Sequence, residues 1–215
     1  MQLLAVSKTW PAACLCEAIA AGQRAFGENY VQEAIEKSAE LTVLGAATGL
    51  EWHFIGPLQS NKTRLVAENF AWVHSIDRLK IADRLATQRP EGLPPLQVCI
   101  QVNVSGEDSK SGCAPDRTAT LARATAALPN LRLRGLMAIP EPSDDIGLQR
   151  RRFGLLRQLR DRINAEGLRL DTLSMGMSHD LEAAIMEGAT LLRIGTAIFG
   201  ERNKVGQPSR EKHES

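Results

Sequence analysis

The sequence predicts an α/β fold, a single (β/α)8 barrel of the TIM type, and three observations support this prediction. Short apolar runs alternate with longer segments of helical period, which is typical of repeated βα units and a parallel sheet. Eight such runs are present, and eight strands in one domain favour a closed barrel over an open doubly wound sheet. The 215 residues, 43% of them hydrophobic, suffice for one large domain with a substantial core.

The apolar runs define the strands, and the segments of helical period define the helices. We expect strands at residues 2–7, 24–27, 52–55, 72–75, 96–104, 133–139, 172–175 and 191–194. We expect helices at residues 11–21, 30–44, 61–69, 78–88, 115–128, 148–166 and 179–187. Gly22, Gly45, Gly167 and Gly188 follow four of these helices, where a left-handed residue commonly ends a helix. The barrel is expected to occupy residues 1–202, and the polar tail at 203–215 is expected to be disordered.

Composition excludes several classes of protein. The formal net charge of +1 argues against a broad nucleic-acid surface. The four cysteines, at positions 14, 16, 99 and 113, form neither a CxxC pair nor a secreted framework, which indicates reduced thiols and no metal site. No uncharged apolar stretch approaches the ~20 residues that a membrane span needs. We therefore expect a cytoplasmic protein with neither nucleic acid nor membrane as a partner.

Lys8 is the most informative residue of the chain. It ends an apolar run, and Pro11 can open the helix that follows. In an α/β barrel the carboxyl end of a strand carries reactive groups. A partly desolvated amine there loses proton affinity and can condense with an aldehyde. The alternative is a surface lysine whose stem lies along apolar residues just beyond the strand.

The ends of the last two predicted strands indicate an anion site. Residues 174–180 (SMGMSHD) pass from strand into helix, and the Ser178 hydroxyl and nearby backbone amides form a favourable seat for an anion. Gly195 and Thr196 follow Arg193 at the end of the eighth strand. Loops after strands seven and eight often bind phosphate in such barrels.

Each of these residues also has a purely structural interpretation. Ser178 and Asp180 can cap a helix, Gly195 and Thr196 can form a plain turn, and Arg193 can pair with a carboxylate in the barrel. Their concurrence with Lys8 favours the ligand interpretation. An amine on the first strand and a phosphate site after the last two match the two fixed ends of a bound pyridoxal phosphate.

Five blocks of sequence resemble the pyridoxal phosphate homeostasis proteins, also called proline synthase co-transcribed proteins. They are residues 4–9 (LAVSKT), 26–33 (FGENYVQE), 52–62 (WHFIGPLQSNK), 174–178 (SMGMS) and 193–200 (RIGTAIFG). The resemblance covers nearly the whole chain and implies a fold-type III barrel like the N-terminal domain of alanine racemase, without that enzyme's second domain. It implies pyridoxal 5'-phosphate (PLP) as the cofactor, Lys8 as the Schiff-base lysine, and Arg193 facing the pyridine nitrogen. Ser178, Gly195 and Thr196 would hold the phosphate.

The resemblance also matches Asn29 and Met137 to positions that line the cofactor. His53 lies in a matched block without an assigned contact, and we expect His53 and His74 to be packed or hydrogen-bonded rather than to be ligands. Family members usually carry a helix before the first strand, and this chain begins at or just before that strand.

Two functions of different classes follow from these observations. The resemblance favours a non-enzymatic carrier and buffer of PLP, a monomer whose partners are PLP and the apo-enzymes that receive it. The alternative is an amino-acid racemase or a related fold-type III enzyme. Racemisation with two bases needs a second base, which is a tyrosine from the other domain in alanine racemase. This chain has one tyrosine, Tyr30. A third possibility, a barrel enzyme for another phosphorylated metabolite, leaves Lys8 unexplained.

Overall fold

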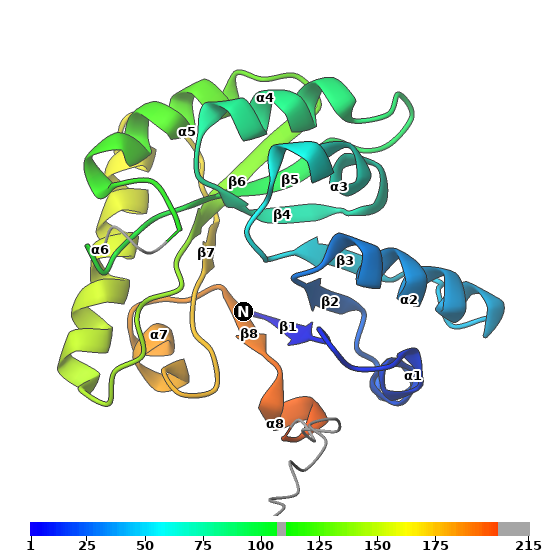
Figure 1. Ribbon diagram of the computed structural model, residues 1–215. Coiled ribbons are helices and arrows are strands. Elements are labelled where there is room, and N and C mark those ends of the chain that lie inside the picture. Colours follow the sequence, from blue (N-terminus) through cyan, green and yellow to red (C-terminus); the bar gives the residue numbers. More distant parts are fainter. Residues whose placement is uncertain (107–110, 202–215) are drawn as a thin grey trace, which may run out of the picture.

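Eight parallel strands close into one barrel, as predicted. The computed structural model describes residues 1–106 and 111–201, so the expected disorder of the tail at 203–215 lies outside the described residues. The strands pair in sequence order and β8 pairs with β1 (Figure 1). They are β1 (Gln2–Val6), β2 (Ala25–Glu28), β3 (Glu51–Phe54), β4 (Trp72–Ile76), β5 (Leu96–Gln101), β6 (Leu131–Met137), β7 (Thr172–Ser174) and β8 (Leu191–Ile194).

The helices form a ring outside the barrel (Figure 1). They are α1 (Ala12–Ala20), α2 (Val31–Val43), α3 (Thr63–Asn69), α4 (Leu79–Gln88), α5 (Thr118–Ala126), α6 (Ile146–Ala165), α7 (Leu181–Met186) and α8 (Thr196–Phe199), and short 3₁₀ turns at Ser60–Lys62 and Pro115–Arg117 precede α3 and α5. The four glycines predicted to end helices have φ angles between +69° and +105°, which confirms that prediction.

Predicted bounds differ from the observed ones by a few residues, as in the sixth strand, which runs over Leu131–Met137 and not over residues 133–139, and two differences are larger. The fifth strand ends at Gln101 and does not continue to residue 104. The Asn103 side chain accepts hydrogen bonds from the backbone N–H groups of Ser105 and Gly106, and this turn ends the strand. The second difference is α8, which was not predicted because four residues are too short to show a helical period.

Alternate residues of each strand face the two sides of the barrel wall. In β1, Ala5 belongs to the large apolar core between strands and helices, whereas Leu4 and Val6 belong to a smaller cluster with residues of β2 and β8. Trp72 of β4, Cys99 of β5 and Met137 of β6 form a further buried cluster inside the barrel. The barrel interior is thus filled with side chains, as in other barrels of this type.

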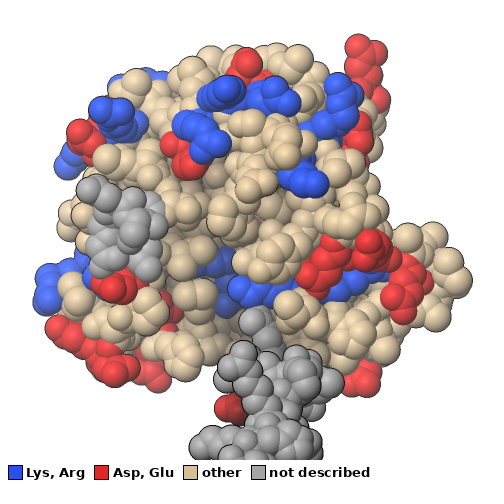
Figure 2. Space-filling view, in the orientation of Figure 1, with Lys and Arg blue, Asp and Glu red and all other residues tan. Residues whose placement is uncertain are grey.

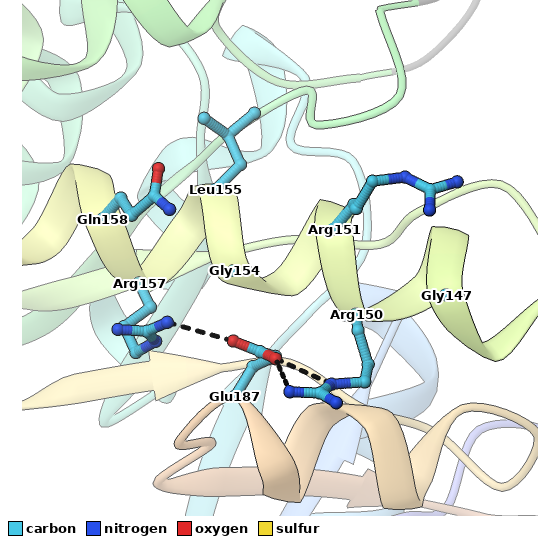
Figure 3. A pocket seen from close by; sticks show the side chains of 8 residues that line it. All are labelled: Gly147, Arg150, Arg151, Gly154, Leu155, Arg157, Gln158 and Glu187. Atoms are coloured by element: carbon cyan, nitrogen blue, oxygen red, sulfur yellow. Dashed lines mark hydrogen bonds and ion pairs between the residues drawn. The ribbon is translucent and has the colours of Figure 1, made fainter.

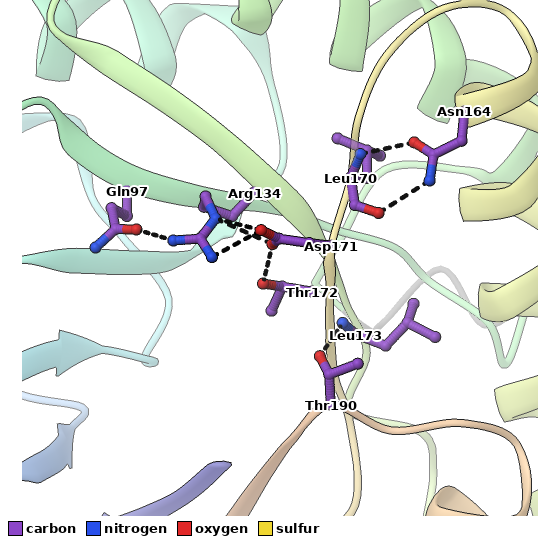
Figure 4. A network of polar contacts seen from close by, with 8 residues as sticks. All are labelled: Gln97, Arg134, Asn164, Leu170, Asp171, Thr172, Leu173 and Thr190. Atoms are coloured by element: carbon purple, nitrogen blue, oxygen red, sulfur yellow. Dashed lines mark hydrogen bonds and ion pairs between the residues drawn. The ribbon is translucent and has the colours of Figure 1, made fainter. Parts of the chain in front are cut away.

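Polar side chains tie the later strands together near the beginning of β7 (Figure 4). Arg134 of β6 donates hydrogen bonds to both carboxylate oxygens of Asp171 and to the Gln97 side chain of β5. The Thr190 hydroxyl accepts a bond of 2.8 Å from the Leu173 N–H. These contacts connect β5, β6 and β7 to the segment that leads into β8.

A buried ionic cluster holds the turn between β1 and α1. The Lys37 ammonium of α2 donates to the Ser7 carbonyl at 2.6 Å, to Glu28 at 2.8 Å and to Glu33 at 2.6 Å. Glu33 also accepts a hydrogen bond from the Thr9 N–H, and Thr9 has a φ of +68°, which is unusual for a β-branched residue. The cluster therefore fixes the backbone immediately before and after residue 8.

We predict that Lys37→Met lowers the free energy of unfolding by about 3–5 kcal/mol, because it leaves a buried carboxylate without its cation. Glu28 is fully buried, and burial already raises the pKa of its carboxyl group. Urea unfolding monitored by circular dichroism measures the change. Lys80→Met is the control: Lys80 is exposed on α4, and its replacement should change stability by no more than about 0.5 kcal/mol. A loss below about 1 kcal/mol for Lys37→Met would show that the cluster does not stabilise the turn.

Candidate functional site

A cavity of about 400 Å³ brings together six of the seven predicted site residues. Its lining residues come from the ends of β1, β2, β7 and β8 and from the segments after β3 and β6. They are Val6, Lys8, Asn29, Ile55, Ile139, Met177, Ser178, His179, Arg193, Gly195 and Thr196. These strand ends meet at the carboxyl face of the barrel, which is where sites of this fold lie. Met137 is the predicted residue that does not line the cavity.

Lys8 lies in the turn directly after β1 and is half-buried. Its side chain lines the cavity, and the ionic cluster around Lys37 holds the neighbouring residues Ser7 and Thr9. A lysine whose stem merely covered apolar surface would not need a turn fixed on both sides. This placement favours the interpretation of Lys8 as a functional amine.

Arg193 is the buried cation of the site, with a relative exposure of 2%. One terminal nitrogen donates to the Ser174 carbonyl at 2.6 Å and to the Ser174 hydroxyl at 2.8 Å. The other donates to the Ala138 carbonyl at 2.8 Å. Burial lowers the pKa of Arg193 to about 10, so the guanidinium remains protonated at neutral pH. These hydrogen-bond acceptors of Arg193 are all neutral groups, and none of them is the barrel carboxylate of the structural alternative.

Two hydroxyls and two small turns form the part of the cavity suited to an anion. Ser178 and Thr196 line it from exposed positions after β7 and β8. A Cβ atom on Gly195 would lie 3.2 Å from the Val6 carbonyl oxygen, so glycine lets the last turn approach β1 closely. Gly176 has a φ of +93°, and a Cβ atom there would lie 2.6 Å from the Cβ of Ala184. These glycines fix the path of both turns.

The helix-capping alternative applies to neither Ser178 nor Asp180. Asp180 stands at the N-cap position of α7 but makes no side-chain bond to that helix. Its carboxylate instead accepts a bond of 2.6 Å from the Met177 N–H. Asp180 therefore shapes the turn, and Ser178 lines the cavity.

Asn29 and Met137 occupy different environments, although the resemblance assigned both to the cofactor. Asn29 lines the cavity. Gly56 packs closely against the Asn29 backbone, since a Cβ atom added to Gly56 would lie 2.4 Å from the Asn29 carbonyl oxygen. Met137 is fully buried with Trp72 and Cys99 inside the barrel. Ile139, two residues later, is the residue of this segment that lines the cavity.

His53 and His74 are hydrogen-bonded core residues, which confirms the interpretation made from the sequence. Both are fully buried, and the two rings contact each other through His53 Nδ1 and His74 Nε2 at 2.9 Å. His53 also contacts Glu51, and His74 contacts Ser174. Sequence reasoning assigned no role to Glu51 or Ser174, because their link to Arg193 exists only in the folded barrel.

A second cavity, of about 430 Å³, lies between α6 and the end of α7 and contains none of the predicted site residues. Figure 3 shows Arg150 and Arg157 of α6 converging on Glu187, at 2.9 and 3.1 Å. The buried carboxylate of Glu187 is thus already paired with two cations.

Charges of both signs are scattered over the face of the molecule in Figure 2, which shows no continuous basic surface.

Residues 1–106 and 111–201, which the structure describes, contain neither a membrane-spanning helix nor a metal-binding cluster. Within these ranges no helix is long and apolar enough to cross a membrane. The same part of the chain contains no group of three or more histidine, cysteine, aspartate or glutamate residues placed to bind a metal ion.

Comparisons with known proteins agree with this description. The family model for the N-terminal domain of alanine racemase matches residues 1–203. The pyridoxal phosphate homeostasis protein of Pseudomonas aeruginosa is 66% identical over 201 residues, which cover 94% of this chain and 84% of that protein. A solved structure of PipY from Synechococcus elongatus PCC7942 with PLP bound is 41% identical, has a TM-score of 0.84, and covers 93% of this chain and 92% of that chain.

A more distant structure supports the fold alone. Alanine racemase from Corynebacterium glutamicum is 18% identical with a TM-score of 0.68, and the match covers 96% of this chain and 58% of that enzyme. The predicted barrel of the alanine racemase type is confirmed. The chain belongs to the alanine racemase N-terminal domain family and, by its identity to the curated relatives, to the pyridoxal phosphate homeostasis proteins.

Proposed function

We propose that this protein binds pyridoxal 5'-phosphate through Lys8 and acts as a carrier and buffer of PLP, without catalytic turnover. The observation on which the proposal rests is that Lys8, Arg193, Ser178 and Thr196 line one cavity. The names of its relatives, and the PLP-bound structure of PipY, support this ligand.

The residues present fit PLP at both ends. Lys8 supplies an amine that can bond to the aldehyde carbon, and the hydroxyls of Ser178 and Thr196 suit a phosphate dianion. When bound, PLP supplies a reactive aldehyde and an electron-withdrawing ring. Arg193 has donors and no acceptor, so a ring nitrogen that faces it remains unprotonated. This weakens the ring as an electron sink and suits storage better than carbanion chemistry.

A carrier needs a site that is reached easily from solvent, and several lining residues are exposed. Ser178, His179 and Thr196 are all exposed at the mouth of the cavity. We propose that apo-enzymes of the cytoplasm receive the cofactor from this open face and that the protein acts as a monomer. Transfer requires that the bond to Lys8 be reversible, which holds for an imine in water.

The racemase alternative lacks, at this cavity, the tyrosine that serves as second base in alanine racemase. Tyr30, the one tyrosine of the chain, is 59% exposed at the start of α2. It lines a neighbouring cavity with Pro57 and Lys62, not the cavity that contains Lys8. Lys8 and the exposed His179 are the lining residues that could act as bases.

We predict that Lys8→Ala abolishes covalent attachment of PLP but retains measurable affinity, because the anion site lies on other strands. Borohydride reduction followed by peptide mass spectrometry should place the pyridoxyl group on Lys8. Lys62→Ala and Lys80→Ala are the matched controls and should leave the attachment unchanged. An adduct found only on Lys62 or Lys80 would refute the assignment.

We predict that Ser178→Ala combined with Thr196→Ala weakens PLP binding by roughly tenfold or more. Each hydroxyl that bonds to a charged phosphate contributes about 1.5–3 kcal/mol. Fluorescence titration of the apo-protein measures the affinity, and circular dichroism verifies the fold. Thr42→Ala combined with Thr87→Ala removes two exposed hydroxyls elsewhere and serves as the control. Unchanged affinity in the first double variant would place the phosphate elsewhere.

We predict that the PLP-loaded protein does not racemise amino acids, because each missing general base reduces a rate by about 10²–10⁴-fold. The loaded protein is incubated with single L-amino acids in deuterated water, and α-proton exchange is followed by NMR. Alanine racemase assayed in parallel is the positive control. Exchange with inversion at about 1 s⁻¹ or faster, which lies in the usual range of enzymes, would favour the racemase.

A further inference from the structure

An unbroken chain of side-chain contacts runs from Arg193 through the barrel to Glu51. Arg193 donates to the Ser174 hydroxyl at 2.8 Å, and that hydroxyl lies 2.8 Å from His74 Nδ1. His74 Nε2 lies 2.9 Å from His53 Nδ1, and His53 Nε2 lies 2.7 Å from Glu51 Oε1. Two consecutive pairs of strands, β3 with β4 and β7 with β8, contribute to this chain, which we call the Arg193–Glu51 relay.

The relay is enclosed by the barrel along most of its length. Ser174, His74 and His53 have no exposed surface, and Arg193 has 2%. Glu51 begins β3 at the amino end of the barrel, and its side chain is 37% exposed. The relay therefore connects the cavity at the carboxyl end with solvent at the opposite end.

The contacts admit one arrangement of protons when both imidazoles are neutral. Burial lowers the pKa of His53 and holds that of His74 well below its ordinary value, and the hydrogen bond from His53 lowers the pKa of Glu51. An ionised Glu51 only accepts, so His53 carries its proton on Nε2 and accepts at Nδ1. His74 must then donate from Nε2 and accept at Nδ1, where the Ser174 hydroxyl donates.

All four hydrogen bonds consequently point the same way, from the cation to the carboxylate. Such a chain is polarised at both ends, and each bond strengthens its neighbours. The ring of Trp72 stacks on His53 at a centroid distance of 5.2 Å and an angle of 8°, which fixes the plane of that ring. The hydroxyl oxygen of Ser174 thereby presents a lone pair to Arg193.

We infer that Glu51, His53, His74 and Ser174 are positioning residues, which hold the Arg193 guanidinium at the cavity and add a carboxylate at the far end of the barrel to the nearby counter-charge of Asp180. The inference rests on the proposed function, because it assigns Arg193 to the ring end of the PLP site. A buried guanidinium needs its donors satisfied and its charge compensated. The relay contributes one acceptor, the Ser174 hydroxyl, beside the two carbonyls, and its carboxylate lies outside the cavity, where it does not repel a phosphate dianion.

The direction of the relay can be measured on the protein without PLP. Long-range nitrogen–proton NMR of the imidazoles, assigned with His53→Gln and His74→Gln, distinguishes the two tautomers and the charged ring. We expect the Nε2-protonated neutral form for both His53 and His74 at neutral pH. A proton on Nδ1 of either ring, or a charged ring, would overturn the inference.

The effect on the cavity is measured by PLP titration of Ser174→Ala. Loss of the hydroxyl removes one hydrogen bond that Arg193 donates. We expect the affinity for PLP to fall roughly tenfold, which is the effect of losing one charge-assisted hydrogen bond. Affinity for inorganic phosphate should remain unchanged, because Ser178 and Thr196 are untouched. Ser75→Ala is the control: Ser75 is also buried on β4, next to His74, and its hydroxyl has no hydrogen-bond partner within the described residues.

Glu51→Ala gives a second test at a half-exposed position outside the cavity, in case Ser174→Ala does not fold. It should also weaken PLP binding, whereas a merely structural role would leave the affinity of the folded variant unchanged. Wild-type affinity in both relay variants would overturn the inference. Failure of the wild-type protein to bind PLP would instead refute the proposed function, and the tautomer measurement would still decide the direction of the relay.

Discussion

Pairing of the first strand with the last is the constraint on which the rest of the structure depends. Leu4 of β1 lies opposite Arg193 of β8, and Ala5 lies opposite Ile194. This parallel register places the turn that carries Lys8 beside the turn formed by Gly195 and Thr196. Residues from opposite ends of the chain therefore line one cavity, and they do so only in the closed barrel.

The two buried cations near this cavity are neutralised in different ways. Lys37 contacts two carboxylates directly, and this local neutralisation makes it a clamp for the turn around Lys8. Arg193 donates its hydrogen bonds to a hydroxyl and two carbonyls; the carboxylate of Asp180 acts on it as a nearby charge, and Glu51 is connected to it through Ser174 and the two histidines. Its charge thus remains available beside the cavity. The difference explains why one cation stabilises a turn while the other can face a ligand.

The strands and most helices could be predicted because burial imposes a period on the sequence. A strand buried on both faces appears as a short apolar run, and glycines mark where helices end. The end of β5 could not be predicted, because Val102 and Val104 continue the apolar pattern of the strand and the turn depends on hydrogen bonds of the Asn103 side chain. The short helix α8 has too few residues to show a period.

The sequence by itself determined the order of strands and helices, the family, and six of the residues that line the cavity, because each of these depends on local pattern or on residues within a short block. Only the tertiary structure decided that Met137 lies inside the barrel and that Ile139 reaches the cavity, since this depends on where β6 ends at the rim. The Arg193–Glu51 relay is likewise a product of the fold. His74 and Ser174 are 100 residues apart, and no local pattern encodes a contact between side chains that meet only when four strands turn them into the same interior.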